Sequence, residues 1–281
     1  MPIDVVPLAP NVGAEVRGID LTEDLDAETV AAIREVWLKH IVVLFRDQNL
    51  GKNDQVRFTN QFGEMGILAR PKEYRTSGHD DMPEGMMLIS NVRENGEPIG
   101  NLPDGEMMFH HDMLHADVPH TATVLYAVDI PSVGGNTLFA SGYAAYESLP
   151  EDVRAPLEGR KAFHHYNYGS QQKGDEQGTP AFSESVHPVF RTHSETRRKA
   201  IYVNRLMTEG IVDMPDDQSA TLLERLFDHS ERPEFVYEHI WRPGDLLMWD
   251  NRCSMHARTD FPAGERRLLW RTTIASDERP Y

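Results

Sequence analysis

His110 and Asp112 stand two residues apart and carry side chains of the types that bind metal ions. In a β-strand, residues i and i+2 point to the same face, so both can face one interior point while His111 faces away. An imidazole and a carboxylate, completed by one distant histidine, leave three positions of an octahedral metal open, as in non-haem Fe(II) oxygenases. The motif is short, and the alternative interpretation is a solvated pair on the surface.

The distant histidine has to be chosen from several, because the chain contains 13. His256 follows an apolar run at 246–249 and a polar turn. Ligand sites form at the mouths of β-barrels, where strands end in turns, so we predict that His256 is the third ligand. The alternative is a core histidine bonded to the backbone. The rival histidines stand in more polar surroundings: His187, His193, His229 and His239.

Two arginines follow His256 in an otherwise apolar segment, Arg267 and Arg271. Being four residues apart, they share one face of a strand. A buried arginine is costly unless an anion pairs with it, and the guanidinium fork binds a carboxylate through two hydrogen bonds. The pair therefore predicts a site for carboxylates close to the metal. The alternative is an exposed edge strand with solvated arginines.

Short strands that could position these residues dominate the chain after Phe109. Helical periodicity predicts helices at Leu25–Lys39, Asp54–Phe62 and Asp217–His229. β-branched and apolar runs between turn signals predict strands at Ile41–Phe45, Met87–Ile89, Ala122–Ala127, Thr137–Ala140, Ile201–Val203, Phe235–His239, Asp245–Trp249 and Leu268–Ile274. The pattern indicates a mainly β protein with peripheral helices, a jelly roll of the cupin-like kind.

We expect residues 1–281 to form a single domain, since neither a repeat nor a low-complexity linker divides the chain. Segment 70–105 is rich in Gly, Pro, Asp and Met and has little regular pattern. Long irregular segments inside a domain are usually functional, often as lids. We therefore predict an active-site lid within 65–106.

Composition narrows the choice of partners and of compartment. The formal net charge of −17 repels phosphate backbones, so we expect no nucleic-acid binding, and an anionic ligand would need a local arginine cluster. The sequence has neither an 18-residue apolar run nor a secretory signal, so we expect a cytoplasmic protein that does not bind membranes. Cys253 is the only cysteine, which excludes an intrachain disulfide and a cysteine-based zinc cluster. We also expect a homo-oligomer.

Nearly the whole chain resembles the taurine dioxygenase and 2,4-dichlorophenoxyacetate dioxygenase (TauD/TfdA) family. The order and spacing of many sequence blocks carry the resemblance, which is far more specific than any single motif. The blocks are 13–21 (GAEVRGIDL), 42–48 (VVLFRDQ), 62–64 (FGE), 109–112 (FHHD), 131–137 (PSVGGNT), 187–193 (HPVFRTH), 249–256 (WDNRCSMH), and the final Arg267 and Arg271.

The resemblance implies a double-stranded β-helix fold and a dioxygenase, an oxidoreductase that uses Fe(2+), 2-oxoglutarate and O2. By position, His110, Asp112 and His256 match the iron ligands. Thr137 and Arg267 match the residues that bind the distal carboxylate of 2-oxoglutarate, and Arg271 matches an arginine near the substrate's acidic group. The implied reaction hydroxylates a small organic acid, a carboxylate or sulfonate with an apolar or aromatic portion, and releases succinate and CO2.

The chain departs from the family where taurine enzymes contact their substrate. Phe109 replaces a frequent Trp, and 106–108 and 69–74 lack the expected Asn and His, which argues against taurine. The residues that we predict to contact substrate, besides Arg271, are Arg70, Tyr74, His165, Tyr166, Arg205 and Met207, with Met107 and Met108 as further apolar contacts. Each has an alternative role in packing or in loop solvation.

Three other functions stay open. The first is a taurine or alkylsulfonate dioxygenase proper. The second is a cupin-like zinc or manganese enzyme for hydrolysis or isomerisation, which would have no use for Thr137 beside Arg267. The third is a non-catalytic binding protein, which would be expected to lose a metal ligand, whereas all three are present.

Overall fold

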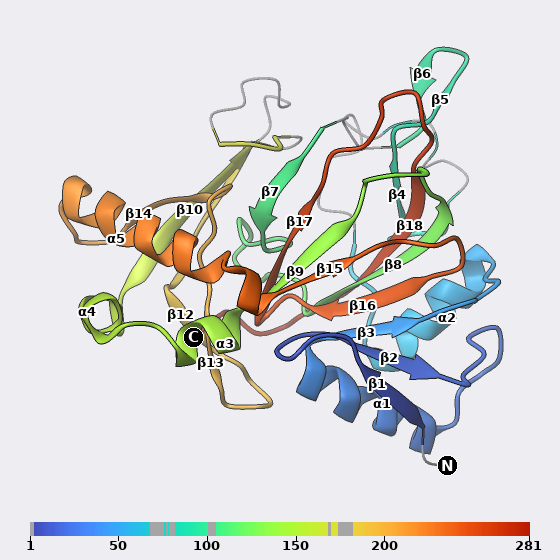
Figure 1. The fold of residues 1–281 in the computed structure, drawn as a ribbon, viewed down its shortest axis with the longest axis horizontal. Coiled ribbons are helices and arrows are strands. Elements are labelled where there is room, and N and C mark those ends of the chain that lie inside the picture. Colours follow the sequence, from blue (N-terminus) through green and yellow to red (C-terminus); the bar gives the residue numbers. More distant parts are fainter. Residues whose placement is uncertain are drawn as a thin grey trace.

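Two facing β-sheets form the centre of the computed structural model, which describes residues 3–67, 76, 78, 82–100, 105–167, 170–173 and 182–281 (Figure 1). The larger sheet contains, in spatial order, β1 (Asp4–Pro7), β2 (Ala14–Arg17), β3 (Val42–Phe45), β16 (Leu246–Asp250), β8 (Ala122–Asp129), β18 (Leu268–Ile274) and β4 (Met87–Ser90). The smaller contains β15 (Val236–His239), β9 (Thr137–Ser141), β17 (Ser254–Arg258) and β7 (Met107–His110). All these neighbours are antiparallel except β2 and β3, and the arrangement is the predicted jelly roll.

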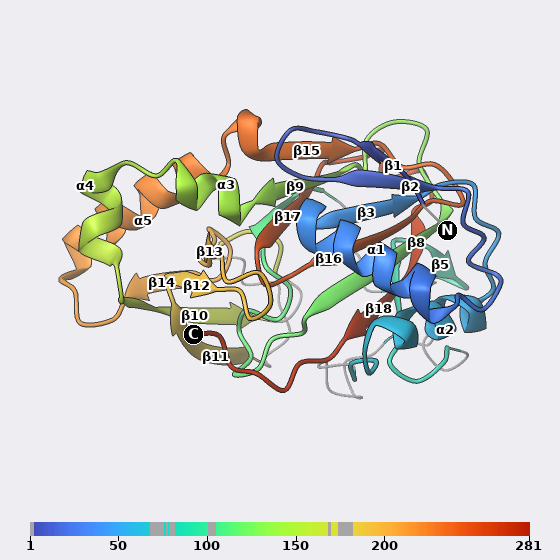
Figure 2. The same cartoon turned by 90° about the horizontal axis from the view of Figure 1, so that it is seen from below.

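Helices α1 (Ala27–His40) and α2 (Lys52–Phe62) cover the outer face of the larger sheet (Figure 2). The Asp26 carboxylate caps α1 by accepting a hydrogen bond from the backbone N–H of Thr29 at 2.8 Å. Ile33 and Trp37 stand four residues apart on α1 and are fully buried against this sheet. The apolar periodicity that predicted the helix is therefore its packing face.

A second layer lies beside the jelly roll, on the left in Figure 1. It contains α3 (Gly142–Glu147), α4 (Glu151–Arg154), α5 (Asp216–Ser230) and a sheet of β11 (Phe182–Pro188), β10 (Lys161–Asn167) and β14 (Thr208–Ile211). The hairpin of β12 (Phe190–Thr192) and β13 (Lys199–Ile201) contacts α3, and a small hairpin of β5 (Arg93–Glu94) and β6 (Glu97–Pro98) precedes β7. Short 3-10 turns occupy Ala155–Leu157 and Pro233–Phe235. The layer has its own apolar core, in which Leu157 and Leu226 are fully buried.

The predicted elements differ from the observed ones mainly at their ends. The strand predicted at Ile201–Val203 is observed earlier, as β13, and the strand predicted from Ile41 begins at Val42. Ile41 has a φ of 70° and ends α1 instead. The sequence patterns did not predict strands β1, β2, β5, β6, β10, β11, β12, β14 and β17 or the short helices α3 and α4. The lid predicted within 65–106 lies partly outside the described residues and stays a prediction. The single domain also stays a prediction. Among the residues that the structure describes, none forms a helix long and apolar enough to cross a membrane.

Candidate active site

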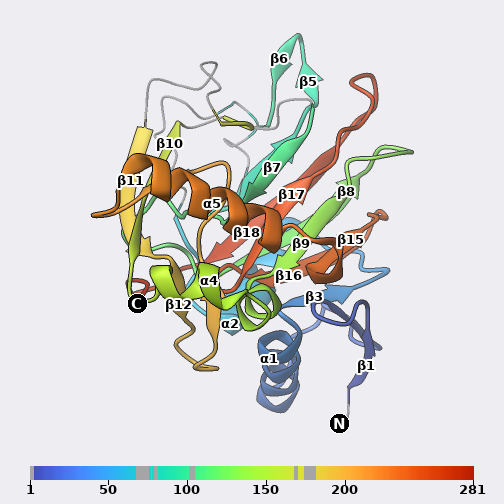
Figure 3. The ribbon, with the colours of Figure 1, turned by 60° about the vertical axis from the view of Figure 1, so that its left-hand side comes forward.

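A cavity of about 210 Å³ lies between the two sheets, and side chains from both form its wall. Strands β4, β8, β16 and β18 of the larger sheet contribute to one side, and β7, β9 and β17 of the smaller sheet contribute to the other. Figure 3 shows β7 beside β17, the strand pair that supplies two of the predicted metal ligands. The cavity therefore lies where the sequence predicted the chemistry.

His110 and His256 lie opposite each other on β7 and β17, with their ring centroids 4.2 Å apart. One ligand atom of each ring and one of Asp112 lie within 4.8 Å of one another. The prediction placed Asp112 on the same strand as His110, but β7 ends at His110 and Asp112 stands in the turn that follows. The three predicted ligands are nevertheless brought together.

The protonation states of these side chains suit a cation. Burial lowers the pKa of His110 and holds the pKa of His256 well below its usual value, so both rings are neutral near pH 7. His110 Nδ1 lies 2.9 Å from the carbonyl oxygen of Met108, which can only accept, so Nδ1 carries the proton and Nε2 keeps its lone pair. Two neutral imidazoles and a carboxylate are a donor set that fits a divalent transition metal.

Asp112 is ionised although it is buried. Burial alone would raise the pKa of its carboxyl group, but the guanidinium of Arg271 and the hydroxyl of Thr123 hold that pKa well below the usual range. Nη2 of Arg271 lies 2.8 Å from Oδ1, and Thr123 Oγ1 donates a hydrogen bond to Oδ2 at 2.6 Å. The carboxylate is thus held by one charged and one neutral donor.

Arg267 is a buried cation, with an exposed fraction of 2%, and it lines the same cavity. Its Nε donates to the carbonyl oxygen of Gly135 at 3.2 Å, and it has no ion-pair partner among the described residues. Burial and the neighbouring Arg258 lower the pKa of Arg267 to about 9. A side chain at Gly135, whose φ is 65°, would crowd Arg267, because an added Cβ would lie 3.2 Å from its Cδ. Such a cation calls for an anionic ligand.

Thr137 completes the predicted carboxylate site. Its Oγ1 accepts a hydrogen bond from Trp241 Nε1 at 3.0 Å, which leaves the hydroxyl proton for an anion in the cavity. Arg258 also lines the cavity but was not predicted as a site residue from the sequence. Arg258 lies opposite Thr137 in the sheet and two residues after His256, so strand alternation from His256 could have found it.

The predicted substrate contacts divide into those on the cavity wall and those away from it. Arg271, Tyr166 and Met207 are on the wall, and so is Met107 but not Met108. His165 and Arg205 are not on it. His165 lies 3.2 Å from both Glu184 and Asn167, and Arg205 pairs with Glu224, Asp228 and Glu231, from α5 and the residue after it. Arg70 and Tyr74 lie outside the described residues.

Much of the remaining wall is apolar or aromatic. Its members come from both sheets and from the loops at their ends: Ile67, Met87, Ile89, Met107, Met113, Leu125, Tyr166, Met207 and Trp249. The cavity therefore combines a cationic region with thioether, aliphatic and aromatic groups, which suits a ligand with an acidic head and an apolar body.

The rival histidines all have other partners. His187 bonds to the carbonyl oxygen of Ala116, and His229 bonds to that of Ala145. His193 and His239 bond to the carboxylates of Asp250 and Asp245, each at 3.0 Å. Of the histidines weighed in the sequence, only His256 reaches the cavity beside His110 and Asp112.

Comparisons with known proteins agree with this geometry. Residues 4–273 match the family model described as "Taurine catabolism dioxygenase TauD, TfdA family". The chain is 32% identical to an (S)-phenoxypropionate/alpha-ketoglutarate-dioxygenase of Sphingobium herbicidovorans, over 98% of this chain and 95% of the relative. It is also 32% identical to an alpha-ketoglutarate-dependent 2,4-dichlorophenoxyacetate dioxygenase of Cupriavidus pinatubonensis, over 96% of this chain and 97% of the relative.

A solved structure extends the likeness to three dimensions. The fold matches that of AAD-2 in complex with Mn(II) and N-oxalylglycine with a TM-score of 0.82 and 27% identity, covering 100% of this chain and 99% of that one. N-oxalylglycine has the two carboxylates and the adjacent carbonyl of 2-oxoglutarate, so that protein was solved with a metal and a 2-oxoglutarate analogue. The neutral histidines, the ionised Asp112 and the buried Arg267 fit the same two groups. The chain belongs to the TauD/TfdA family of 2-oxoglutarate-dependent dioxygenases.

Proposed function

We propose that the protein uses Fe(II), 2-oxoglutarate and O2 to hydroxylate a small organic acid that has an apolar or aromatic portion. The single observation that carries the substrate class is the position of Arg271 beside Asp112 on a cavity wall that also contains thioethers and aromatic rings. An acid held by Arg271 would keep its reacting carbon a few bonds from the acidic group. The relatives named for phenoxypropionate and 2,4-dichlorophenoxyacetate support an aryloxy acid.

Each group in the cavity then has one task. His110, Asp112 and His256 would hold Fe(II), which supplies the activation of O2 for oxidation of a C–H bond. Arg267 and Thr137 would bind the distal carboxylate of 2-oxoglutarate, with the guanidinium as a charge-assisted donor and the hydroxyl as a neutral one. Arg271 would orient the substrate's acid, while Met107 and Met207 accommodate its body and exclude water.

The partners that we propose follow from the same site and from composition. The ligand is a small acid, and the net charge of −17 disfavours nucleic acid. A cytoplasmic location agrees with a single cysteine, Cys253, that is buried and unpaired.

A substrate panel tests the proposal. Substrate-dependent formation of succinate is measured with aryloxyalkanoic acids, alkyl sulfonates, taurine and the neutral amides of the same acids. We expect the aryloxy acids to give the highest kcat/KM and the amides to give little turnover. If amides react as well as acids, Arg271 does not hold an acid. If taurine is the best substrate, the apolar wall does not select the substrate and the enzyme is a taurine dioxygenase proper.

A further inference from the structure

Asp112 differs from the other two metal ligands in how its position is fixed. His110 and His256 lie on adjacent strands, where backbone pairing sets the direction of each side chain. Asp112 lies beyond the end of β7, in a turn whose next residue, Met113, has a φ of 62°. Since no strand ladder directs the carboxylate of Asp112, its orientation depends on the side chains that bind it.

Two buried side chains form a chain of hydrogen bonds to this carboxylate. Asn251 Nδ2 donates to Thr123 Oγ1 at 3.0 Å, and Thr123 Oγ1 donates to Asp112 Oδ2 at 2.6 Å. Both Thr123 and Asn251 have an exposed fraction of 0%. An amide N–H can only donate, so it occupies an acceptor site of the hydroxyl, and the single hydroxyl proton is directed to Asp112. The order of donors and acceptors in this chain is therefore fixed.

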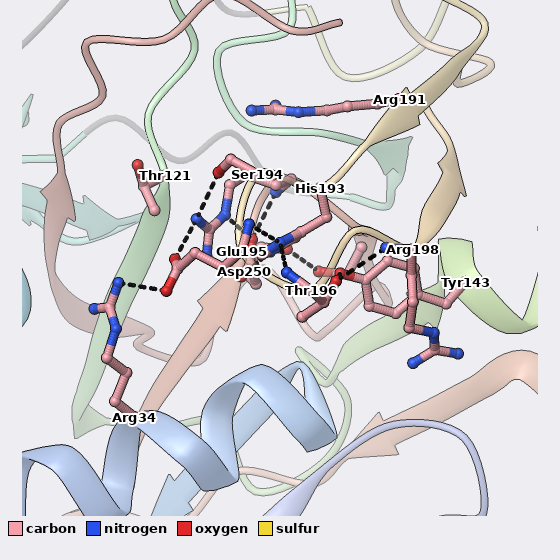
Figure 4. Close-up of polar contacts among 12 residues, drawn as sticks. Arg34, Thr121, Tyr143, Arg191, His193, Ser194, Glu195, Thr196, Arg198 and Asp250 are labelled. Carbon is pink, nitrogen blue, oxygen red and sulfur yellow. Dashed lines mark hydrogen bonds and ion pairs between the residues drawn. The ribbon is translucent and has the colours of Figure 1, made fainter.

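Asn251 stands in the turn between β16 and β17, and a buried ion-paired cluster holds that turn (Figure 4). Asp250 accepts hydrogen bonds from Arg252 Nε at 2.9 Å and Nη2 at 2.6 Å, and from His193 Nε2 at 3.0 Å. Arg252 also pairs with Glu195 at 2.7 Å, and Glu195 pairs with Arg34 of α1 at 2.8 Å. The cluster therefore connects the turn to α1 and to the segment that carries His193 and Glu195.

The same cluster contains a second group of potential metal ligands, His193, Asp250 and Cys253. His193 Nδ1 accepts from the backbone N–H groups of Glu195 and Thr196, both at 3.1 Å, so the proton is on Nε2 and points at Asp250. Both oxygens of Asp250 accept hydrogen bonds from Arg252. Because both ring nitrogens of His193 and both carboxylate oxygens of Asp250 are already hydrogen-bonded, the cluster supports the turn rather than a cation.

We propose that Thr123 and Asn251 are positioning residues for the metal site. By holding Oδ2 of Asp112, they leave Oδ1, which Arg271 contacts in this structure, as the oxygen that a metal would take. They would also keep the carboxylate aligned when a metal displaces Arg271 from Oδ1. The ion-paired cluster fixes the turn that carries Asn251. A continuous series of contacts therefore connects Arg34 of α1, through this turn and Thr123, to Asp112. The inference rests on the metal site of the proposed function.

Metal-binding measurements on purified, metal-free protein test the proposal without turnover. Mn²⁺ alone is titrated into the wild type, Thr123→Val, Thr123→Ser and Asn251→Ala, with binding followed by calorimetry and by the electron paramagnetic resonance signal of free Mn²⁺. Loss of an outer partner of a metal ligand typically weakens affinity by about 10- to 100-fold. We expect that loss in Thr123→Val, recovery in Thr123→Ser, which keeps the hydroxyl, and an intermediate loss in Asn251→Ala.

Thr272→Val is the matched control. Thr272 is also a fully buried threonine of the larger sheet, but its hydroxyl bonds to Thr59 at 2.7 Å. Thermal unfolding is recorded for every variant. The proposal is overturned if Thr123→Val binds Mn²⁺ as the wild type does, or if Thr272→Val loses as much affinity as Thr123→Val.

The variant His110→Ala distinguishes a failure of this proposal from a failure of the proposed function. If His110→Ala loses Mn²⁺ binding while Thr123→Val keeps it, the positioning role is wrong and the metal site stands. If both variants bind as the wild type does, the metal site itself is wrong.

Discussion

Nη2 of Arg271 lies 2.8 Å from Oδ1 of Asp112, so the residue that we propose to hold the substrate's acid is bonded to a residue that we propose as a metal ligand. The guanidinium supplies the positive charge that the buried carboxylate requires. A divalent metal ion at the site would also supply positive charge and would compete with Arg271 for Oδ1. Metal binding would thereby release Arg271 toward the cavity, which couples metal binding to substrate binding.

Replacing Arg271 by Met should lower kcat/KM for acidic substrates by at least about 30-fold, because losing one member of a buried charged pair costs about 2–5 kcal/mol. The measurement is succinate formation as a function of substrate concentration. Arg266→Met is the control, since Arg266 is an exposed arginine of the same segment that pairs with Asp129. Equal losses in the two variants would contradict a specific role for Arg271.

Replacing Arg267 by Met should abolish stabilisation by the 2-oxoglutarate analogue. A ligand at 100 times its Kd stabilises the folded state by about 2.7 kcal/mol. We therefore expect N-oxalylglycine, added to protein already saturated with Mn²⁺, to raise the Tm of the wild type and of Arg266→Met further but not that of Arg267→Met. An unchanged Tm increase in Arg267→Met would place the co-substrate elsewhere.

Asp250 should make stability depend on pH in acid. Burial would raise its pKa, but Arg252 and His193 outweigh burial and hold the pKa well below its value of about 3.9 in an unfolded chain. A lowered pKa stabilises the folded state above about pH 4, and this contribution is lost as the pH falls toward the folded pKa. Asp250→Asn should therefore cost about 3–5 kcal/mol at pH 7, because the buried Arg252 loses the carboxylate that binds its Nε and Nη2 and keeps only its ion pair with Glu195.

The difference between Asp250→Asn and the wild type should shrink as the pH falls below about 4. Urea unfolding across this range measures it. Asp228→Asn is the control, since Asp228 is an exposed partner of Arg205 and should contribute no more than about 1 kcal/mol. A difference for Asp250→Asn that does not change with pH would argue against the ion pair as its source.

Arg205→Ala should leave the KM for substrate unchanged, although Arg205 was predicted as a contact. Its guanidinium pairs with three acids outside the cavity wall. Met207→Ala, two residues away, should raise the KM, because Met207 is on the wall and each buried methylene is worth about 0.8 kcal/mol. The steady-state kinetics of the two variants compare these positions directly, and a raised KM in Arg205→Ala would refute the placement.

The sequence predicted that His110, Asp112 and His256 lie together and that Arg267 and Arg271 share their cavity, because residue type and spacing indicate such a cluster. It could not predict that Thr123 supports Asp112, since this contact depends on β8 passing beside the turn after β7. It also could not predict that Met207 is on the cavity wall while Arg205 is not. Both stand in the irregular segment between β13 and β14, where no helix or strand periodicity indicates which side chains point inward. Strand β17 was missed because the polar residues of Ser254–Arg258 interrupt its apolar pattern, and these include the ligand His256.

Four methionines, Met87, Met107, Met113 and Met207, line the cavity in which we propose that oxygen is activated. Thioethers are readily oxidised to sulfoxides, which are polar and chiral. When oxygen is consumed without a substrate in place, these thioethers are oxidisable groups on the wall of the same cavity. Enzyme incubated with Fe(II), 2-oxoglutarate and O2 but without substrate should therefore form methionine sulfoxide at these residues. Its affinity for apolar acids should fall, and treatment with methionine sulfoxide reductases should restore that affinity. The sulfoxide content of the wall would then increase with the number of turnovers that take place without substrate.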